Sequence, residues 1–341
     1  EAALKVYTVF SDSSSCSLQF ENYALTDIEI IGYSTKQNKK FILPFKQSWK
    51  MGTYEDQAQK RKKYFDFLPR NIFYKTSVTG DSLLKTKVSA FPPNKFVNVL
   101  GPGAKPLSNS NDSIIVLEKG IYTFNSTVYF PRNKKLIIKE GVRINLRSNA
   151  RFVSYSPIEM RGSKDNPIEF FTTDGKAGGL VILPEGKQVV LEHVNFSRLT
   201  GGNNENWVLT GAVTVYEGKV KISNCTFRYN KSEDALNLIR CEFKMNNCVI
   251  SETQSDGFDA DFCTGSITNC QFNNTGNDCI DFSGSQISIE SCTINGSGDK
   301  GISGGESSIL KVLNCDIKNA SIAVASKDNS KITVENTSIS N

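Results

Sequence analysis

Asn224-Cys225-Thr226-Phe227 is the first clear copy of a short motif that returns five more times before the chain ends. The later copies are Asn247-Cys248-Val249-Ile250, Asn269-Cys270-Gln271-Phe272, Ser291-Cys292-Thr293-Ile294, Asn314-Cys315-Asp316-Ile317 and Asn336-Thr337-Ser338-Ile339. Successive copies are 23, 22, 22, 23 and 22 residues apart. A nearly fixed period of this length indicates a repeat architecture in which each unit stacks on the next.

The residues between the copies follow the pattern of strands. Runs such as Lys219-Val220-Lys221-Ile222 and Gln286-Ile287-Ser288-Ile289 alternate polar and apolar side chains with a period of two. Short strands and turns that repeat in this way predict a right-handed parallel β-helix, in which equivalent residues lie ~4.8 Å apart on successive coils. We expect the Asn column to form an amide ladder in a turn, and the Cys column to form an inward ladder of unpaired thiols.

The β-helix is predicted to occupy residues 96–341. Its first coils are less regular, and the single histidine, His193, stands in the Asn column, where a structural role is expected. Residues 1–95 lack the period, and strand-like runs at 27–33, 40–44 and 71–75 predict a small β-sandwich there. The excess positive charge also lies in this part, because residues 1–100 carry 15 Lys and Arg against 9 Asp and Glu, and the remainder carries 25 against 26.

An acidic stripe crosses several coils of the predicted β-helix. With a period of 22, one polar column contains Asp234, Asp256, Asp278 and Lys300. A second column contains Asn237, Asp259, Asp281 and Ser303, and Asp261 extends the acidic surface. Carboxylates stacked ~5 Å apart repel by about 1 kcal/mol per pair in water, and by more at a lower effective dielectric constant. The next coil, at residues 322–325, has no acid, so the acids are confined as they would be in a functional site.

Four interpretations of this stripe are open. A bound cation such as Ca²⁺ would accept several carboxylate oxygens as ligands. Lys300 and protons shared between carboxylates would reduce the repulsion and raise the pKa of some carboxyl groups. Paired carboxylates could carry out acid–base chemistry on a sugar. Finally, Asp side chains could simply cap turns by accepting hydrogen bonds from backbone N–H groups.

The stripe resembles the active-site pattern of the polygalacturonase family. The segments Ser255-Asp256-Gly257-Phe258-Asp259, Asn277-Asp278-Cys279-Ile280 and Gly298-Asp299-Lys300-Gly301-Ile302-Ser303 are similar to that family's Asn-Thr-Asp-Gly-Phe-Asp, Asp-Asp-Cys and Gly-His-Gly motifs on successive coils. The resemblance covers about 50 residues and implies a glycoside hydrolase in which Asp256 and Asp278 are catalytic carboxylates. The chain departs from the family at Asn277, which stands for the third carboxylate, and at Lys300, which stands for the histidine.

The same stripe is also similar to the calcium sites of pectate-lyase-like β-helices. This resemblance implies that Lys300 abstracts the proton α to a uronate carboxylate, because a neighbouring cation would lower its pKa toward neutral pH. The residues that would hold the Ca²⁺ ion are Asp256, Asp259, Asn277, Asp278 and Asp281. The side chains expected to contact substrate around this centre are Glu233, Asp234, Asn237 and Asp299.

The sequence therefore predicts a carbohydrate-active protein of the bacterial secreted or cell-surface type, which acts on an acidic polysaccharide by calcium-assisted elimination. A glycoside hydrolase using Asp256 and Asp278 is the alternative within the enzyme class, and a non-catalytic surface or glycan-binding module is the alternative outside it. No run of ~20 apolar residues encodes a transmembrane helix. A near-neutral solenoid with an acidic stripe argues against a nucleic-acid partner. A sandwich and a solenoid in series also suggest a piece of a larger surface protein.

Overall fold

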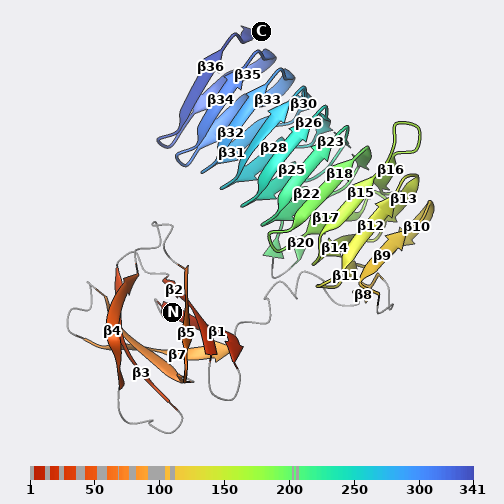
Figure 1. Ribbon diagram of the computed structural model, residues 1–341. Helices are drawn as coiled ribbons and strands as arrows, with labels where there is room; N and C mark the ends of the chain where they lie inside the picture. Colours follow the sequence, from red (N-terminus) through yellow and green to blue (C-terminus); the bar gives the residue numbers. More distant parts are fainter. Residues whose placement is uncertain are drawn as a thin grey trace. The chain divides into compact units, whose positions relative to one another are not determined.

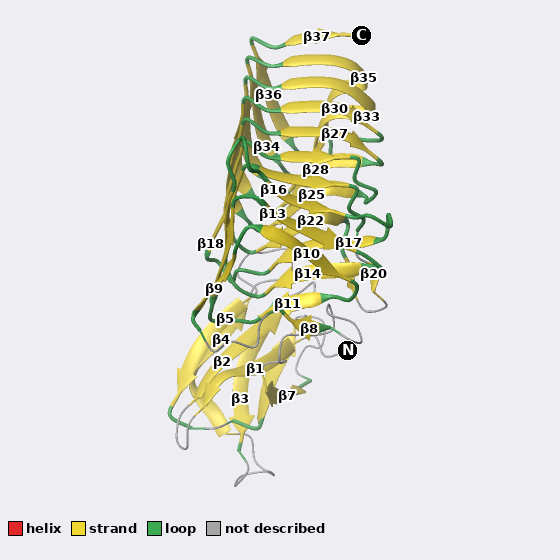
Figure 2. Cartoon of the chain, turned by 90° about the vertical axis from the view of Figure 1, so that its right-hand side faces the viewer, coloured by secondary structure: helices red, strands yellow, loops and turns green. Residues whose placement is uncertain are grey.

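The structure is a computed structural model of the chain, and it describes residues 4–11, 16–22, 27–35, 43–51, 60–67, 69–76, 82–90, 104–107, 112–201, 203–204 and 207–341. The chain folds into two compact units, Glu1–Val97 and Asn98–Asn341 (Figure 1). The boundary predicted between residues 95 and 96 lies outside the described residues. The described elements are all strands (Figure 2), and none of these ranges contains a helix long and apolar enough to cross a membrane.

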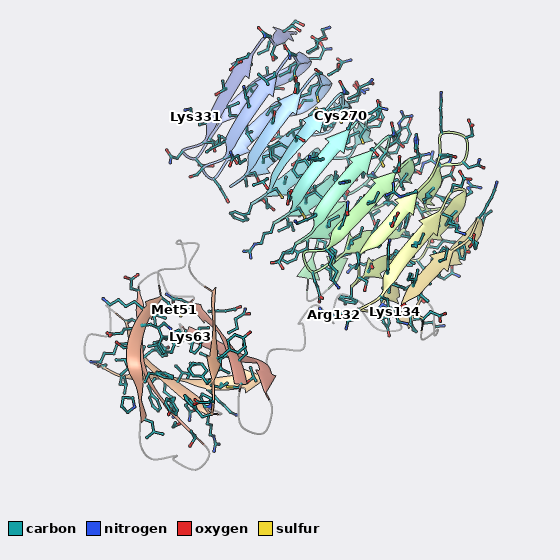
Figure 3. The ribbon with its side chains drawn as sticks, in the orientation of Figure 1. Met51, Lys63, Arg132, Lys134, Cys270 and Lys331 are labelled. Atoms are coloured by element: carbon teal, nitrogen blue, oxygen red, sulfur yellow. The ribbon has the colours of Figure 1, made fainter. Side chains whose placement is uncertain are left out.

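The N-terminal unit is a seven-stranded, mostly antiparallel sheet in the order β4-β3-β6-β7-β1-β2-β5. β1 pairs with β2 on one edge and, in parallel, with β7 on the other, so that the seven strands are joined in one hydrogen-bonded order. Phe20 and Met51 are fully buried in its core. Lys63, labelled with Met51 in Figure 3, places its Nζ 3.7 Å from the ring centroid of Trp49. The strands are β1 (Leu4–Ser11), β2 (Cys16–Asn22), β3 (Ile28–Ser34), β4 (Leu43–Met51), β5 (Lys60–Phe65), β6 (Asn71–Thr76) and β7 (Leu84–Ala90).

The C-terminal unit is a solenoid whose coils stack in parallel (Figure 1). One face is a ten-stranded parallel sheet that takes one strand from each coil. Its alternating residues point inward, as in β23, where Val220 and Ile222 are buried between exposed lysines. The strands of this sheet are β9 (Ile114–Leu117), β12 (Lys135–Lys139), β15 (Ile158–Arg161), β18 (Gln188–Glu192), β23 (Lys219–Ser223), β26 (Glu242–Asn246), β29 (Thr264–Thr268), β32 (Gln286–Glu290), β34 (Ile309–Leu313) and β36 (Lys331–Glu335).

The rest of the solenoid wall is an eighteen-stranded parallel sheet, to which most coils contribute two strands separated by a bend. One row of strands runs through β19, β24, β27 and β30, and a second row runs through β22, β25, β28 and β31. A short antiparallel pair, β20 (Asn203–Asn204) and β21 (Trp207–Val208), precedes β22. The strands of the large sheet are β8 (Lys105–Pro106), β10 (Gly120–Phe124), β11 (Val128–Phe130), β13 (Val142–Leu146), β14 (Ala150–Ser154), β16 (Ile168–Phe171), β17 (Ala177–Ile182), β19 (Val194–Ser197), β22 (Gly211–Tyr216), β24 (Thr226–Arg228), β25 (Asp234–Ile239), β27 (Val249–Thr253), β28 (Asp256–Asp261), β30 (Gln271–Thr275), β31 (Ile280–Ser283), β33 (Thr293–Gly305), β35 (Asp316–Ser326) and β37 (Ser338–Ser340).

The interior of the solenoid is built from columns of equivalent residues. Phe196 stacks on Phe227 one coil further on, with ring centroids 4.9 Å apart. All nine cysteines are free and buried, and the N–H of Cys225 donates to the Sγ of Cys248 at 3.4 Å. In the same way, the N–H of Cys248 donates to the Sγ of Cys270, which is labelled in Figure 3. The predicted inward ladder of unpaired thiols is therefore confirmed. The Sγ atoms of Cys248 and Cys270 also satisfy backbone donors.

The Asn column turns the chain through left-handed backbone. Its members have φ between 48° and 54°, a conformation that Asn tolerates better than most residues. His193 shares this conformation with φ 49°, which confirms its place in the column. The expected amide ladder is formed only in part, because Asn247 donates to Asn224 whereas Asn269 donates to Asn246 Oδ1 at 3.2 Å. The backbone angle, more than an amide ladder, accounts for the repeated Asn.

Replacing Asn314 tests this explanation. Asn314→Ala should lower the free energy of unfolding of the solenoid by about 1 kcal/mol, because Ala is disfavoured at a φ of 52°. Asn314→Gly is the matched control and should retain more of the stability, since Gly adopts positive φ without a steric cost. Chemical denaturation followed by circular dichroism measures both. Equal losses for the two variants would show that the side-chain amide, and not the backbone angle, is what the position needs.

Candidate functional site

The acidic residues lie on successive parallel strands that pair in register, of which β25 and β28 are seen side by side in Figure 2. Asp234 pairs with Asp256. Asn237 pairs with Asp259, and Asp259 pairs with Asp281 on the following coil. Between these columns runs the buried apolar column of Leu236, Phe258, Ile280 and Ile302. The alignment of polar columns predicted from the 22-residue period is thus the one that the fold adopts.

Asp256 and Asp278 each accept a backbone N–H from the next coil. Asp256 Oδ1 accepts from the N–H of Asp278 at 2.9 Å and from Nδ2 of Asn277 at 2.7 Å. Asp278 Oδ1 accepts from the N–H of Lys300 at 2.9 Å. These bonds are the turn-capping interactions that the sequence left open as one interpretation, and they give a structural reason for an Asp at this position of each coil.

Lys300 ends the first column as an ion-pair partner. Its Nζ lies 3.3 Å from Oδ1 and 3.4 Å from Oδ2 of Asp278, and it also bonds to Asp299. The Asp278 side chain is 2% exposed and that of Lys300 is 16% exposed. The hydrogen bond to Asp299, aided by the charge of Asp278, raises the pKa of Lys300. In this arrangement both neighbouring carboxylates stabilise the ammonium form of Lys300.

Asn237 joins the two columns. Its Nδ2 donates to Asp234 Oδ2 at 3.1 Å and to Asp259 Oδ2 at 2.7 Å. Burial, followed by the charge of Asp256, raises the pKa of Asp234 to about 7. Burial also raises the pKa of Asp259 to about 9, with further contributions from Asp234, Asp261 and other nearby carboxylates. Asp259 consequently holds a proton at neutral pH, close to Asp234, whose pKa is lower.

The remaining acids of the stripe are partly exposed. Asp256, Asp261 and Asp281 are all half-buried, and burial raises the pKa of both Asp256 and Asp261. In the described part of the chain, no Lys or Arg forms a salt bridge with these three residues or with Asp234 or Asp259. Shared protons, amide donors and the single Lys300 therefore offset the repulsion, as one of the four interpretations expected.

The structure adds residues that the period did not indicate. The side chain of Thr210 bonds to Asp234 and lowers its pKa against the larger effect of burial. The Ser297 hydroxyl lies 2.8 Å from the carbonyl oxygen of Asn277 and 2.6 Å from that of Lys300. Neither residue stands in an acidic column, so spacing alone gave no signal for them.

The four side chains expected to contact substrate fall into two groups. Glu233 is exposed, and the Asp299 side chain is 43% exposed. Asp234 and Asn237 are buried, at 2% and 1% exposure. Of the buried pair, Asn237 bonds to Asp259, and only Glu233 and Asp299 are open to solvent.

Calcium does not fit this arrangement. Among the described residues, no group of three or more His, Cys, Asp or Glu side chains is placed to hold a metal ion. Three of the five expected ligands already have other partners, since Asp256 accepts from Asn277, Asp278 binds Lys300 and Asp259 accepts from Asn237. Ca²⁺ needs six to eight oxygen ligands around one point. We therefore derive no catalytic step through a calcium ion.

Comparison with known families agrees with this architecture. The sequence of residues 210–341 matches the family described as the right handed beta helix region. The solenoid is a right-handed parallel β-helix. This confirms the predicted fold class, and the N-terminal sheet is a separate small β domain ahead of it. No curated protein matches the chain.

Solved structures similar to the β-helix share little sequence with it. A variant of the periplasmic alginate epimerase AlgG is 9% identical over 67% of this chain and 84% of its own, with a TM-score of 0.35. The A-module of the mannuronan C-5 epimerase AlgE4 from Azotobacter vinelandii is 14% identical over 66% and 88%, with a TM-score of 0.22. The GH87 α-1,3-glucanase of Streptomyces thermodiastaticus is 6% identical over 99% and 95%, with a TM-score of 0.21. Values this low are compatible with many functions, so the site has to be argued from its own residues.

The raised pKa of Asp259 predicts how the stability of the β-helix depends on pH. The unfolded chain releases this proton near pH 4, whereas the folded state keeps it to about pH 9. Between these values the folded state binds more protons, so the free energy of unfolding should fall as the pH rises, by up to about 1.4 kcal/mol per pH unit for one proton. Urea unfolding at a series of pH values measures this slope.

Asp259→Asn should reduce the decrease in the free energy of unfolding with rising pH, because the amide does not titrate. Asp165→Asn removes an exposed carboxylate elsewhere on the β-helix and is the matched control, which should leave the slope unchanged. If Asp259→Asn and Asp165→Asn gave the same pH profile as the parent protein, the proton would not reside on Asp259.

Calcium titration tests the mismatch between the sequence-based expectation and the geometry. Because three of the five expected ligands are already bonded to amides or to Lys300, Ca²⁺ added to chelator-treated protein should bind no more tightly than in the millimolar range. Isothermal titration calorimetry measures this directly. Micromolar binding that Asp278→Asn abolishes would instead establish the calcium site that the resemblance implied.

Proposed function

We propose that the β-helix hydrolyses a polysaccharide with the carboxyl groups of its acidic stripe. The observation that carries this proposal is the position of Asp259. Its carboxyl group accepts a hydrogen bond from Asn237 on one coil, is in register with Asp281 on the next, and has no cationic partner among the described residues. This arrangement favours one protonated carboxyl group beside an ionised one, and such a pair is what cleavage of a glycosidic bond requires.

In this mechanism Asp259 is the general acid. It donates its proton to the glycosidic oxygen while the bond from that oxygen to the anomeric carbon breaks. Asp281 lies one coil spacing away, ~4.8 Å, close to the ~5 Å separation at which a second carboxylate attacks the anomeric carbon itself. Water then hydrolyses the resulting ester and gives a proton back to Asp259, so the product retains its anomeric configuration.

This assignment differs from the one that the polygalacturonase resemblance implied. Asp256 and Asp278 are bonded to backbone N–H groups, and Asp278 also binds Lys300. These donors favour the charged form of both carboxyl groups, although burial leaves the pKa of each above its usual value. We assign a positioning role to both residues. The charge of Asp256 also raises the pKa of the neighbouring Asp234.

Elimination with Lys300 as the base stays an alternative prediction, as does a non-catalytic glycan-binding module. The elimination is supported by the place of Lys300 at the end of the acidic column, and it is opposed by the raised pKa of the ammonium group. A lyase releases products with a conjugated double bond, a hydrolase releases only new reducing ends, and a module releases neither. The three functions are therefore separable by product analysis.

The full-length protein should release reducing ends, without unsaturated products, from at least one member of a panel of acidic and neutral polysaccharides. Asp259→Asn should lower that rate by roughly 10²-fold or more, because a general acid contributes this much. The rate should also fall above about pH 9, where Asp259 loses its proton. Asp165→Asn should match the parent protein.

Unsaturated products lost in Lys300→Met would support the lyase in place of the hydrolase. Product formation that is unaffected by Asp259→Asn would rule out the role given to this residue. A panel of polymers that are bound but never cleaved would leave the non-catalytic module. For any of these functions we expect the protein to be secreted or on the cell surface.

A further inference from the structure

A polar cavity lies on the β-helix, over the row of strands that does not carry the acidic stripe. Its volume is about 550 Å³, and it is lined from β13, β16, β19 and β24 and from the corner that follows β19 and β24. The lining residues that matter here are Arg143, Phe171, Asn195, Arg198, Arg228 and Tyr229. Its character is the reverse of the acidic stripe, since three arginines face one acid, Glu169.

Two of these arginines have no carboxylate partner. Arg143 is paired with Glu169, which neutralises both. Neither Arg198 nor Arg228 forms a salt bridge with any acid in the described ranges, and both are exposed. Two unpaired guanidinium groups at one cavity attract anions, and their planar fork of donors matches a carboxylate.

Aromatic rings stand next to these charges. The guanidinium carbon of Arg198 lies 5.9 Å from the ring centroid of Tyr229, and that of Arg143 lies 5.0 Å from the ring of Phe171. Tyr229 is 52% exposed. Such rings offer a flat apolar surface to the C–H face of a sugar, while the arginines hold charged substituents at its edge.

The corner that carries Arg198 and Tyr229 is conformationally costly for them. Their φ angles are 57° and 58°, in the left-handed region that side chains other than Asn and Gly rarely adopt. The next three coils place Glu252, Asn274 and Gly296 at the equivalent corner, and Glu252 has a φ of 54°. Three successive coils therefore carry a side chain other than Asn or Gly at this corner, and the first two of these side chains, Arg198 and Tyr229, line the cavity.

The acidic stripe cannot provide recognition of an anionic polymer. Its carboxylates repel uronate groups, so a polymer that is both acidic and a substrate must be held by cations elsewhere. The cavity meets this need on the same coil as the stripe, since Arg228 ends β24 and Asp234 begins β25, six residues later. The neutral residues that follow Arg228 in its column, Ser251 and Asn273, continue a polar path along the axis.

From these observations we infer that the cavity binds carboxylate-bearing sugar residues of an acidic polysaccharide. Arg198 and Arg228 bind the carboxylates and Tyr229 stacks on a sugar ring. This inference rests on the proposed function in that the bound polymer is the substrate, and binding is measured separately from cleavage.

The test is binding of a fluorescent oligogalacturonate to the full-length protein at low and moderate salt. The double variant Arg198→Gln, Arg228→Gln should bind roughly tenfold more weakly or worse, as expected when charge-assisted hydrogen bonds are lost. The matched control, Lys311→Gln with Lys331→Gln, removes two exposed positive charges from the ten-stranded sheet and should bind as the parent does. Arg228→Lys should bind more weakly than the parent even though its charge is kept.

Several outcomes would overturn the inference. Unchanged binding by the Arg198 and Arg228 variant would exclude the cavity, and an equal loss in the lysine control would reduce the effect to net charge. Equal competition by sulfated dextran would assign the cavity to sulfate, and equal competition by single-stranded DNA would assign it to nucleic acid. Asp259→Asn should keep its binding, so a failure of cleavage and a failure of binding remain distinguishable.

Discussion

The structure depends on one constraint, which is that each coil of the β-helix hydrogen-bonds to the next in parallel register at the spacing of neighbouring β-strands. Every side chain therefore lies directly above its equivalent on the coil before. Apolar and small residues benefit from this, as the stacked rings of Phe196 and Phe227 and the thiol of Cys248 under Cys225 show. Like charges do not benefit, so an acidic column exists only if something offsets the repulsion.

In this protein several local contacts together offset the repulsion between the stacked carboxylates. Asp256 and Asp278 bond to N–H groups of the following coil, Lys300 pairs with Asp278, and Asn237 donates to two carboxylates at once. Protonation removes the remaining repulsion between the carboxylates, which is why Asp259 keeps its proton to about pH 9. The same crowding that threatens the fold thus supplies a proton donor beside ionised carboxylates, the combination that acid–base chemistry on a sugar requires.

Opposite charges are sorted onto the two rows of strands in the large sheet. The row that includes β25, β28 and β31 carries the acids, and the row that includes β13, β16, β19 and β24 carries the arginine cavity. A bend near Tyr229 separates them within one coil. A polymer that follows the axis can be held through its charge on one row and approached by carboxyl groups on the other, without the arginines neutralising the proton donor.

Much of this was fixed by the sequence. The 22-residue spacing of the Asn and Cys motifs sets strand, turn and register together, because coils of equal length can stack in only one alignment. It therefore determined the β-helix, the buried free thiols, and the two polar columns that contain Asp256 and Asp259. The calcium ligands and the basic Lys300 were expected from resemblance, and resemblance does not report which donors each carboxylate already has.

Those donors were decided only by the tertiary structure. Asn237 donates to both Asp234 and Asp259. Thr210, which belongs to neither polar column, bonds to Asp234. The arginine cavity brings together residues between 143 and 229 from four coils. The continuous N-terminal sheet likewise follows from the parallel pairing of β1 with β7, whose residues are far apart in the chain. The physical reason is that a period specifies which residues share a column, whereas burial and hydrogen bonding between columns specify which of them carry a proton, a charge or a free donor.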